Sequence, residues 1–341
     1  MTARAPHDAP ALTGTMPAWR QHRYGDPDVV ALEETRIPAP GPGEVLLRVR
    51  ATALNNGDIR VLRGEPLLVR LAFGLRRPKQ PVRGMDVAAT VAGLGKGVTE
   101  FAVGDEIVVE LPAGGGLAAS AIAPVKRLVR RPAGLAPAVA AALPIAAGTA
   151  WQALDRARVA AGQRVLVIGA SGGVGHFAVQ LAALRGAEVW ALSGEPNREL
   201  VESLGATRTF DYRRVQPGSA ELPDGSFDAV IDIAGTAPLR ALQRLVRDGG
   251  AVALVSGEGG RVLGPIGRLA AASARSLFSR RRLRPVAAVA NRDILAELVA
   301  LAEAGRIQPV IERTYAFGES AAALVHVAAG HTAGKVVVLA A

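Results

Sequence analysis

The chain contains no cysteine among its 341 residues. This absence excludes disulfide bonds, thiolate nucleophiles and every zinc site that is built on cysteine ligands. Aromatic residues make up only 4% of the chain, so side chains that could stack on the bases of a single-stranded nucleic acid are scarce. No uncharged apolar run reaches the length of about 20 residues that a membrane-spanning helix needs. We therefore expect a protein that neither crosses a membrane nor binds nucleic acid.

Residues 1–15 lack the basic start and apolar core of a signal peptide, and we interpret them as a disordered tail of a cytoplasmic protein. The formal net charge of +10 is the one feature that favours an acidic partner. Its sharpest cluster consists of Arg280, Arg281, Arg282 and Arg284. Because aromatics are so few, we interpret this cluster as a solvated or interface-lining arginine stretch.

The first part of the chain shows the pattern of an antiparallel barrel. Residues 45–53 alternate Leu and Val with Arg, which indicates a half-buried strand, and residues 87–109 consist of short Val-rich pieces separated by glycines. At residues 137–154 the character changes to alanine-rich helical sequence. A length of 341 residues favours two domains, and we expect a junction in this region.

The middle of the chain alternates strands and helices. Residues 163–169 form a continuous apolar run of the kind found in strands that are buried on both faces of a parallel sheet. The pattern then predicts helices at 174–184, 198–204 and 239–246, alternating with strands at 188–192, 229–233 and 251–255. This βαβ rhythm predicts a doubly wound parallel sheet. Further helices are predicted at 263–283 and 294–304, and a final strand at 335–339.

The most informative motif is VLVIGASGGVG at residues 165–175, where a buried strand runs into a glycine-rich turn that opens a helix. Such a turn lets a pyrophosphate approach the amide groups at the helix start, where the helix dipole favours negative charge. Gly172 and Gly175 occupy the second and third glycine positions of the usual pattern, and Ala170 stands where the first is expected. The surrounding alternation of strands and helices supports a dinucleotide site with a nicotinamide cofactor.

The end of the second strand of this unit determines which nicotinamide cofactor fits. An acidic residue there would hold the ribose 2′-hydroxyl and repel a 2′-phosphate, but the strand ends in Ser193 and Gly194. Arg198 follows shortly and its guanidinium suits a 2′-phosphate. Glu195 is the alternative ribose-binding residue if the loop bends inward. We therefore predict NADPH, with NADH as the open alternative.

Four segments in order resemble the zinc-independent medium-chain dehydrogenase/reductase superfamily, in particular its quinone oxidoreductase and alkenal reductase group. They are LNNGDIRVLRG at 54–64, RGMDVAATVAGLGKGVTEFAVGD at 83–105, AALPIAAGTAWQAL at 141–154 and LVESLGATRTFDY at 200–212. The resemblance implies an α/β fold in which a Rossmann doubly wound parallel sheet is inserted into a GroES-like antiparallel β-barrel. It places the catalytic domain at 16–140 and 290–341 and the Rossmann NADP-binding domain at 141–289, and it implies a homodimer.

The resemblance also implies roles for individual residues. Asn55 and Arg60 would reach the nicotinamide and the substrate, and we take them as the candidate catalytic residues. The cofactor would contact the turn residues Ala170, Ser171, Gly172, Gly173 and Val174 together with Thr149, Ser193, Arg198, Tyr212, Ala234, Ser256 and Lys335.

Zinc-dependent relatives carry a Gly-His-Glu motif, whereas this chain has Gly84, Met85 and Asp86 at the comparable place. The five histidines are scattered, so we expect no zinc. The predicted reaction is hydride transfer to a quinone or an α,β-unsaturated carbonyl such as an enone or alkenal. Some enoyl-thioester reductases of the superfamily have a tyrosine just after the first loop's glycine. Here Gly64 is followed by Glu65, which argues against a fatty-acyl thioester and leaves the proton donor unidentified. The alternative is an NADPH-binding protein with vestigial activity and a structural or RNA-binding role.

Overall fold

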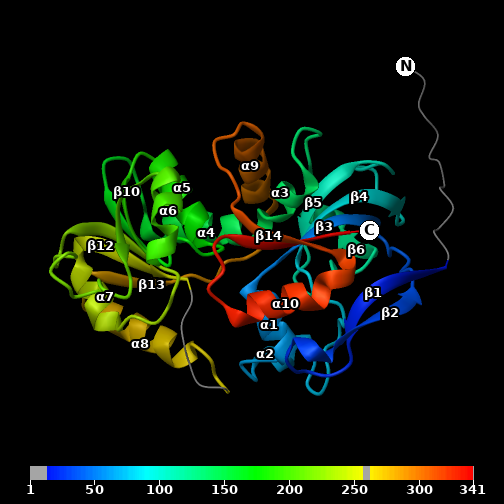
Figure 1. Ribbon diagram of the computed structural model, residues 1–341, viewed down its shortest axis with the longest axis horizontal. Coiled ribbons are helices and arrows are strands. Elements are labelled where there is room, and N and C mark those ends of the chain that lie inside the picture. Colours follow the sequence, from blue (N-terminus) through cyan, green and yellow to red (C-terminus); the bar gives the residue numbers. More distant parts are fainter. Residues whose placement is uncertain (1–13, 256–261, 341) are drawn as a thin grey trace.

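The structure, a computed structural model, describes residues 14–255 and 262–340. It contains a parallel sheet and a larger antiparallel sheet, which lie in the left and right halves of Figure 1. A separate two-stranded ribbon is formed by β1 (Thr15–Gln21) and β2 (Val30–Arg36). Within the described residues no helix is long and apolar enough to cross a membrane.

The parallel sheet has six strands in the order β10-β9-β8-β11-β12-β13. This order is that of a doubly wound sheet, in which the chain leaves a central strand toward one edge and then returns to build the other. The strands are β8 (Arg164–Ile168), β9 (Glu188–Ser193), β10 (Ala206–Asp211), β11 (Phe227–Asp232), β12 (Val246–Leu254) and β13 (Arg282–Pro285).

Helices cover both faces of this sheet because its strands are apolar on both sides. Val165 and Val167 of β8 face the core that contains α4 (Pro144–Ala157) and α5 (Gly175–Leu184). Leu166 and Ile168, which alternate with them, face the core that contains α7 (Leu239–Leu245) and α8 (Ile266–Leu277). The short α6 (Arg198–Ser203) packs beside β10.

The larger sheet, which is antiparallel except for the parallel pair β14 and β15, is built from both ends of the chain. Its order is β14-β15-β3-β4-β5-β7, with β6 also paired to β3. The C-terminal strand pairs antiparallel with β3, where Val336 lies opposite Leu54, so the last strand rejoins the N-terminal part of the fold. The strands are β3 (Glu44–Leu54), β4 (Asp86–Leu94), β5 (Glu106–Glu110), β6 (Ser120–Pro124), β7 (Val129–Arg130), β14 (Ile311–Ala316) and β15 (Lys335–Leu339).

Further helices flank the antiparallel sheet and its junction with the parallel one. They are α1 (Asn56–Arg63), α2 (Val69–Phe73), α3 (Pro137–Ala141), α9 (Arg292–Glu303) and α10 (Ser320–Ala329). Short 3-10 turns are η1 (Pro27–Val29), η2 (Val125–Arg127), η3 (Glu195–Asn197) and η4 (Phe317–Glu319).

The prediction of one helix over residues 263–283 is wrong beyond Leu277. Helix α8 ends at Leu277, and the arginine cluster lies at and around the edge strand β13. Leu283 faces the core while its arginine neighbours point elsewhere, which is the alternation of a strand and not a helical period. Arg281 pairs with Asp248 at 3.0 Å, and Arg284 donates to the carbonyl of Arg156 at 2.9 Å.

Candidate functional site

The glycine-rich turn between β8 and α5 has the shape that a dinucleotide needs. The residue with positive φ is Gly169, at 84°. A Cβ on Gly175 would lie 2.0 Å from the carbonyl oxygen of Gly169, so the helix can begin this close to the strand only with glycine there. A Cβ on Gly172, by contrast, would meet only that oxygen, at 3.5 Å. Gly172 therefore borders open space, as the residue that a pyrophosphate approaches should.

The amide groups of this turn are available to a ligand. Among the hydrogen bonds of the described residues, none is donated by the backbone N–H of Ser171, Gly173 or Val174. Unpaired amides at the start of a helix are the donors that bind phosphate oxygens in dinucleotide sites. The turn that the sequence singled out therefore fits the pyrophosphate of a dinucleotide cofactor.

The turn also contacts the C-terminal strand of the other sheet. The N–H of Gly334 donates to the carbonyl of Ser171 at 2.8 Å. A Cβ on Gly173 would lie 3.5 Å from Cδ of Lys335, so the lysine stem passes directly beside the turn. Lys335 was predicted on the cofactor path, and the structure brings it to the turn, although its ammonium group points to a different set of partners.

His176 packs against the turn and contacts Gly172. Its side chain is fully buried, and Nδ1 lies 3.0 Å from the carbonyl oxygen of Gly172, while Nε2 is buried without a hydrogen-bond partner. Burial lowers the pKa of His176 to about 4, so the imidazole is neutral at physiological pH. In the neutral ring, Nδ1–H donates to Gly172 and Nε2 is a bare acceptor. His176 thus fixes the carbonyl of the glycine that borders the phosphate site.

Arg213, which the sequence reasoning missed, follows β10 and lies beside the end of β9. Ser193 is buried, and its carbonyl accepts from the N–H of Tyr212 at 3.0 Å. A Cβ on Gly194 would lie 3.5 Å from Nη1 of Arg213 and 3.6 Å from the ring of Tyr212. The guanidinium of Arg213 stacks over that ring at 4.8 Å. Tyr212 and Arg213 therefore stand together at the strand end where the adenosine ribose of a dinucleotide lies.

Arg198 and Glu195 are bonded to each other. Nε and Nη2 of Arg198 donate to the two carboxylate oxygens of Glu195 at 3.0 and 2.9 Å. Both side chains are about half exposed. The two alternatives that the sequence left open, a phosphate-binding Arg198 and a ribose-binding Glu195, are thus tied together in the structure, whereas Arg213 has only a distant contact to Asp211 at 3.8 Å.

A buried group of polar side chains lies where the antiparallel sheet meets the turn. Lys335 Nζ donates to Oδ1 of Asn55 at 2.5 Å and lies 3.5 Å from Oδ2 of Asp86. The amide Nδ2 of Asn55 donates to the same Asp86 oxygen at 2.9 Å. Asp58 accepts from the backbone N–H of Asn55 and Gly84 at 2.9 and 2.8 Å. We call Asn55, Asp58, Asp86 and Lys335 the buried polar cluster.

The ionisable members of this cluster are almost completely removed from water. Lys335 is 2% exposed, and Asp58 and Asp86 are 0% exposed. Burial raises the pKa of Asp86 to about 7 and raises that of Asp58, while the ammonium of Lys335 opposes both shifts. Burial likewise lowers the pKa of Lys335. Asn55, a candidate catalytic residue, is fixed at both ends of its carboxamide by its hydrogen bonds to Lys335 and Asp86.

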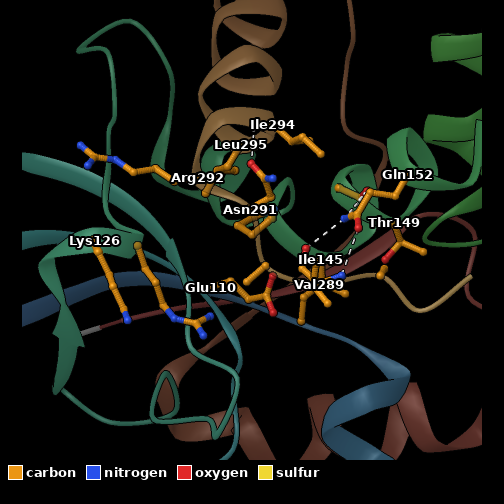
Figure 2. Close-up of a pocket in the computed structure, with 15 residues that line it drawn as sticks. Glu110, Lys126, Ile145, Thr149, Gln152, Val289, Asn291, Arg292, Ile294 and Leu295 are labelled. Atoms are coloured by element: carbon orange, nitrogen blue, oxygen red, sulfur yellow. Dashed lines mark hydrogen bonds between the residues drawn. The ribbon is translucent and has the colours of Figure 1, made fainter. Parts of the chain in front are cut away.

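A pocket of about 380 Å³ opens beside this cluster. Figure 2 shows its walls: Glu110 from the end of β5, Lys126 from η2, Ile145, Thr149 and Gln152 from α4, and residues 289–295 leading into α9. The side chain of Gln152 bonds both the N–H and the carbonyl of Val289, at 3.1 and 3.0 Å, and so ties this last segment to α4. Thr149, which was predicted beside the nicotinamide, lines the pocket.

The pocket and the buried polar cluster share a wall. The N–H of Ile145, a pocket residue, donates to Oδ1 of Asp86 at 3.2 Å. In the sheet, Asp86 lies directly opposite Glu110, so the two carboxylate residues are cross-strand neighbours. Burial raises the pKa of Glu110, and the Arg127 guanidinium opposes this shift. A hydride acceptor in this pocket would therefore face Glu110 and Thr149.

The remaining predicted residues are placed as follows. Arg60 is exposed in the last turn of α1 and is not among the residues that line the pocket. Ala234 lies beside the turn, because a Cβ on Gly169 would be 3.3 Å from its backbone nitrogen. Ser256 falls outside the described residues. Within the described residues, no three His, Asp or Glu side chains are arranged to hold a metal ion.

The sequence reasoning missed Glu110, Arg127 and Arg213. Arg213 directly follows the predicted Tyr212, so its place in the chain was a signal that could have been used. Glu110 ends the apolar strand EIVVE, and a charged residue at a strand end is too common to indicate a site. Only the fold shows that it faces Asp86 and the pocket.

Comparison with known proteins agrees with this geometry. Residues 41–133 match the family model "Alcohol dehydrogenase GroES-like domain", and residues 204–338 match "Zinc-binding dehydrogenase". A chloroplast envelope quinone oxidoreductase homolog of Arabidopsis thaliana is 33% identical over 95% of this chain and 98% of its own length. The chain belongs to the medium-chain dehydrogenase/reductase superfamily. It is an oxidoreductase of the quinone oxidoreductase-like group, which confirms the family and the fold class that its segments predicted.

Two further proteins are informative. A 2-methylene-furan-3-one reductase of Solanum lycopersicum is 30% identical over 96% of this chain and 80% of its own length. The solved structure of the quinone oxidoreductase from Coxiella burnetii superposes with a TM-score of 0.83 at 25% identity, covering 96% of this chain and 99% of its own. The structural similarity therefore covers almost the whole chain.

Proposed function

We propose that this protein is an NADPH-dependent reductase that transfers hydride to a quinone or to an α,β-unsaturated carbonyl compound without zinc. The observation that carries the proposal is the combination of a glycine turn with unpaired amides and a pocket lined by Thr149 and Glu110. Lys335 and Asp86 link the two, because the stem of Lys335 passes the turn and Asp86 accepts from a pocket residue. A nicotinamide cofactor supplies hydride when bound. The relatives named as quinone oxidoreductases and as a furanone reductase support both acceptor classes.

The protein's own residues have three tasks in this reaction. The amides of Ser171, Gly173 and Val174 bind the pyrophosphate, and Thr149 positions the nicotinamide end. The pocket surrounds the acceptor with the side chains of α4, η2 and the segment before α9, and so orients it. The Arg127 guanidinium, whose Nη1 is buried without a partner, stabilises negative charge that develops on the acceptor oxygen.

The absence of zinc in this proposal rests on the donor set. Where zinc-dependent relatives have their Gly-His-Glu motif, Met85 and Asp86 stand, and Asp86 is already bonded to Asn55, Ile145 and Lys335. No cysteine is available in the chain. The residues at this place therefore do not fit a catalytic zinc ion.

The preference for NADPH rests on Arg213 as well as on the lack of an acid after Ser193. Arg213 lies beside Gly194, has no close counter-ion, and carries the planar donors that suit a 2′-phosphate. Arg198 contributes less, since Glu195 occupies its donors.

The proposed division of the chain follows the sheets. We propose a catalytic domain at 16–140 and 290–341 and a cofactor domain at 141–289, since β8 to β13 make up the parallel sheet and the other sheets use strands on either side of it. We also propose a homodimer and a cytoplasmic location.

The activity is tested by NADPH oxidation with a panel of quinones, enones and alkenals. We expect turnover with at least one class, unchanged by EDTA and without stoichiometric zinc by elemental analysis. Loss of turnover with EDTA, restored by zinc, would refute the zinc-free mechanism. Tight NADPH binding without turnover on any acceptor would instead support a binding protein with vestigial activity.

The cofactor preference is tested by fluorescence titration of NADPH and NADH. We expect NADPH to bind several-fold more tightly, and Arg213→Gln to weaken NADPH binding about tenfold while NADH binding stays the same. Arg214→Gln is the matched control, because Arg214 is exposed at the next position. Equal affinities of the wild-type protein for both cofactors would contradict the proposal and leave Glu195 as the ribose-binding residue.

A further inference from the structure

Glu110 is the one carboxylate among the residues that line the pocket, and it has a carboxylate neighbour behind it. It ends β5, and its cross-strand partner in β4 is Asp86. In antiparallel sheets the Cβ atoms of such partners lie about 4.5 to 5.5 Å apart, on the same face. Asp86 itself is 0% exposed. Of the two carboxyl groups, therefore, only Glu110 reaches the pocket.

The hydrogen bonds of the two residues differ sharply. Asp86 accepts from the amide of Asn55, from the N–H of Ile145 and from the ammonium of Lys335. The carboxyl group of Glu110 makes no hydrogen bond to another residue within the described part of the chain. Because the hydrogen bonds of Asp86 are made within the protein and those of Glu110 are not, the Glu110 carboxyl group can form hydrogen bonds with a ligand in the pocket.

The charges around Glu110 lie on its own sheet, on η2 and on α9. Burial raises the pKa of Glu110, and the Arg127 guanidinium opposes this shift. Burial also raises the pKa of Asp86, and the negative charge of Glu110 adds to that rise. The positive charges that line the pocket are Arg127 and Lys126 from η2 and Arg292 from α9. Arg292 is already bonded to Glu100, and the wall from α4 carries no charge. Lys335 and Asp58 are the charged neighbours of Asp86. Close carboxyl groups titrate as a pair and retain one proton over a wide pH range.

We propose that Glu110 is the acid that delivers a proton to the α-carbon of an α,β-unsaturated carbonyl acceptor. The inference rests on the proposed function and identifies a catalytic residue for it. Hydride from the nicotinamide forms the bond to the β-carbon, the C=C electron pair moves to give an enolate, and the enolate α-carbon takes the proton of Glu110. The carboxylate left on Glu110 regains a proton from water through the pocket mouth, so that enone, reduced cofactor and one proton give saturated ketone and oxidised cofactor.

This role separates the two acceptor classes. Carbon protonation of an enolate is slow without a positioned acid, and general acids contribute about 10²- to 10⁴-fold. A quinone takes its protons on oxygen, where exchange with water is fast. Glu110 is therefore needed for enones and dispensable for quinones.

The first experiment compares Glu110→Gln with Glu297→Gln, an exposed carboxylate on α9. For Glu110→Gln we expect enone turnover to fall about 100-fold and quinone turnover to change less than about threefold. The alkaline limb of the enone pH profile, where Glu110 would lose its proton, should disappear in this variant. Glu297→Gln should resemble the wild type in both. Glu110→Asp, which keeps an acid on a shorter stem, should restore part of the enone turnover and confirms that folding is not the cause.

The second experiment reads the proton itself. Reduction of an α-methyl enone in D₂O should place deuterium on one face of the α-carbon with wild-type protein and on both faces with Glu110→Gln. In the cofactor-free protein, infrared difference spectra should show a protonated carboxyl band that Glu110→Gln removes or shifts. Unchanged facial selectivity and enone turnover in Glu110→Gln would overturn the role of Glu110 while quinone reduction still supports the proposed function. A wild-type protein that reduces neither class overturns both.

Discussion

The glycine-rich turn and the buried polar cluster lie side by side, yet they are built in opposite ways. The turn is one contiguous stretch, residues 170–175, in which the N–H groups of Ser171, Gly173 and Val174 donate no hydrogen bond within the described residues. The cluster assembles Asn55, Asp58, Asp86 and Lys335 from three segments that are far apart in the sequence, and its charges satisfy one another. Lys335 touches both, since its stem passes Gly173 and its ammonium bonds Asn55.

This contrast shows what kind of chemistry a sequence reveals. A binding surface made of backbone amides needs small residues at fixed spacing, and that spacing is visible as a motif. A buried ion cluster needs only that a few ordinary polar residues converge, and convergence is a property of the fold. Experiments that remove one element of each region test whether the turn serves the ligand and the cluster serves the protein's stability.

The largest effect is expected from Lys335→Met. The change removes the only cation of the cluster and leaves Asp86 buried without its ion-pair partner, while Asp58 keeps the charge of the nearby Arg83. Breaking a buried pair by removing one partner destabilises proteins by about 3 to 5 kcal/mol. We expect a loss of this order in the free energy of unfolding, measured by urea denaturation at pH 7.

The control is the double variant Lys335→Met with Asp86→Asn, which removes both charges of the closest pair. It should recover part of the lost stability, because the remaining carboxamide has no charge to compensate. If the single variant is as stable as the wild type, the cluster does not hold a buried charge pair, and the contrast with the turn fails.

More of the fold than of the candidate site could be predicted from the sequence. The doubly wound sheet, the antiparallel sheet and the position of the glycine-rich turn followed from hydrophobic period and glycine spacing, and the resemblance of four segments implied how they combine. Strand β10 and strand β13 were not predicted from period, because ATRTFD and RLRP carry polar residues that mask the alternation. The first lies at one edge of the sheet and the second at the other, where one side of each strand is left unpaired.

The candidate site shows the same limit at the level of single residues. Thr149 and Tyr212 were chosen by resemblance and lie beside the pocket and the strand end. Asn55 was chosen as a group that reaches substrate, and the structure shows it bonded at both ends by Lys335 and Asp86. No pattern in the chain could show this, since 280 residues separate Asn55 from Lys335.

The second prediction concerns how the free energy of unfolding depends on pH. The group concerned is His176, whose ring bonds the carbonyl of Gly172 in the turn. Its pKa in the folded state is about 4 against 6.5 for an exposed histidine, so the unfolded chain binds more protons between these values. Stability is therefore full above pH 6.5 and falls as the pH drops toward 4. The gap corresponds to about 3 kcal/mol at most. Urea denaturation at pH 7 and pH 4.5 measures it.

His176→Gln is the variant for comparison, because its amide nitrogen can still donate to the carbonyl of Gly172 and it has no titrating group. It should show a smaller loss of stability on acidification than the wild type. Equal acid dependence of wild type and His176→Gln would mean that other buried groups govern it.

The last prediction tests the turn itself with Gly172→Val. The φ of Gly172 does not lie in the left-handed region, and a Cβ there would meet only the Gly169 carbonyl oxygen, so backbone strain is not expected. A branched side chain would instead occupy the volume that the phosphate oxygens need. We expect a loss in NADPH affinity on the order of 100-fold by isothermal titration, with a thermal midpoint close to that of the wild type.

The comparison variant is Gly175→Val, three residues further along the same turn. There a Cβ would lie 2.0 Å from the Gly169 carbonyl oxygen and 2.8 Å from the backbone of Ala170, so helix and strand must move apart. Gly175→Val should therefore lower the thermal midpoint, which Gly172→Val should not. The two glycines thus separate a position that serves the ligand from one that serves the fold. A folded Gly172→Val protein that binds NADPH with wild-type affinity would place the pyrophosphate elsewhere, and the cofactor assignment of residues 170–175 would have to be withdrawn.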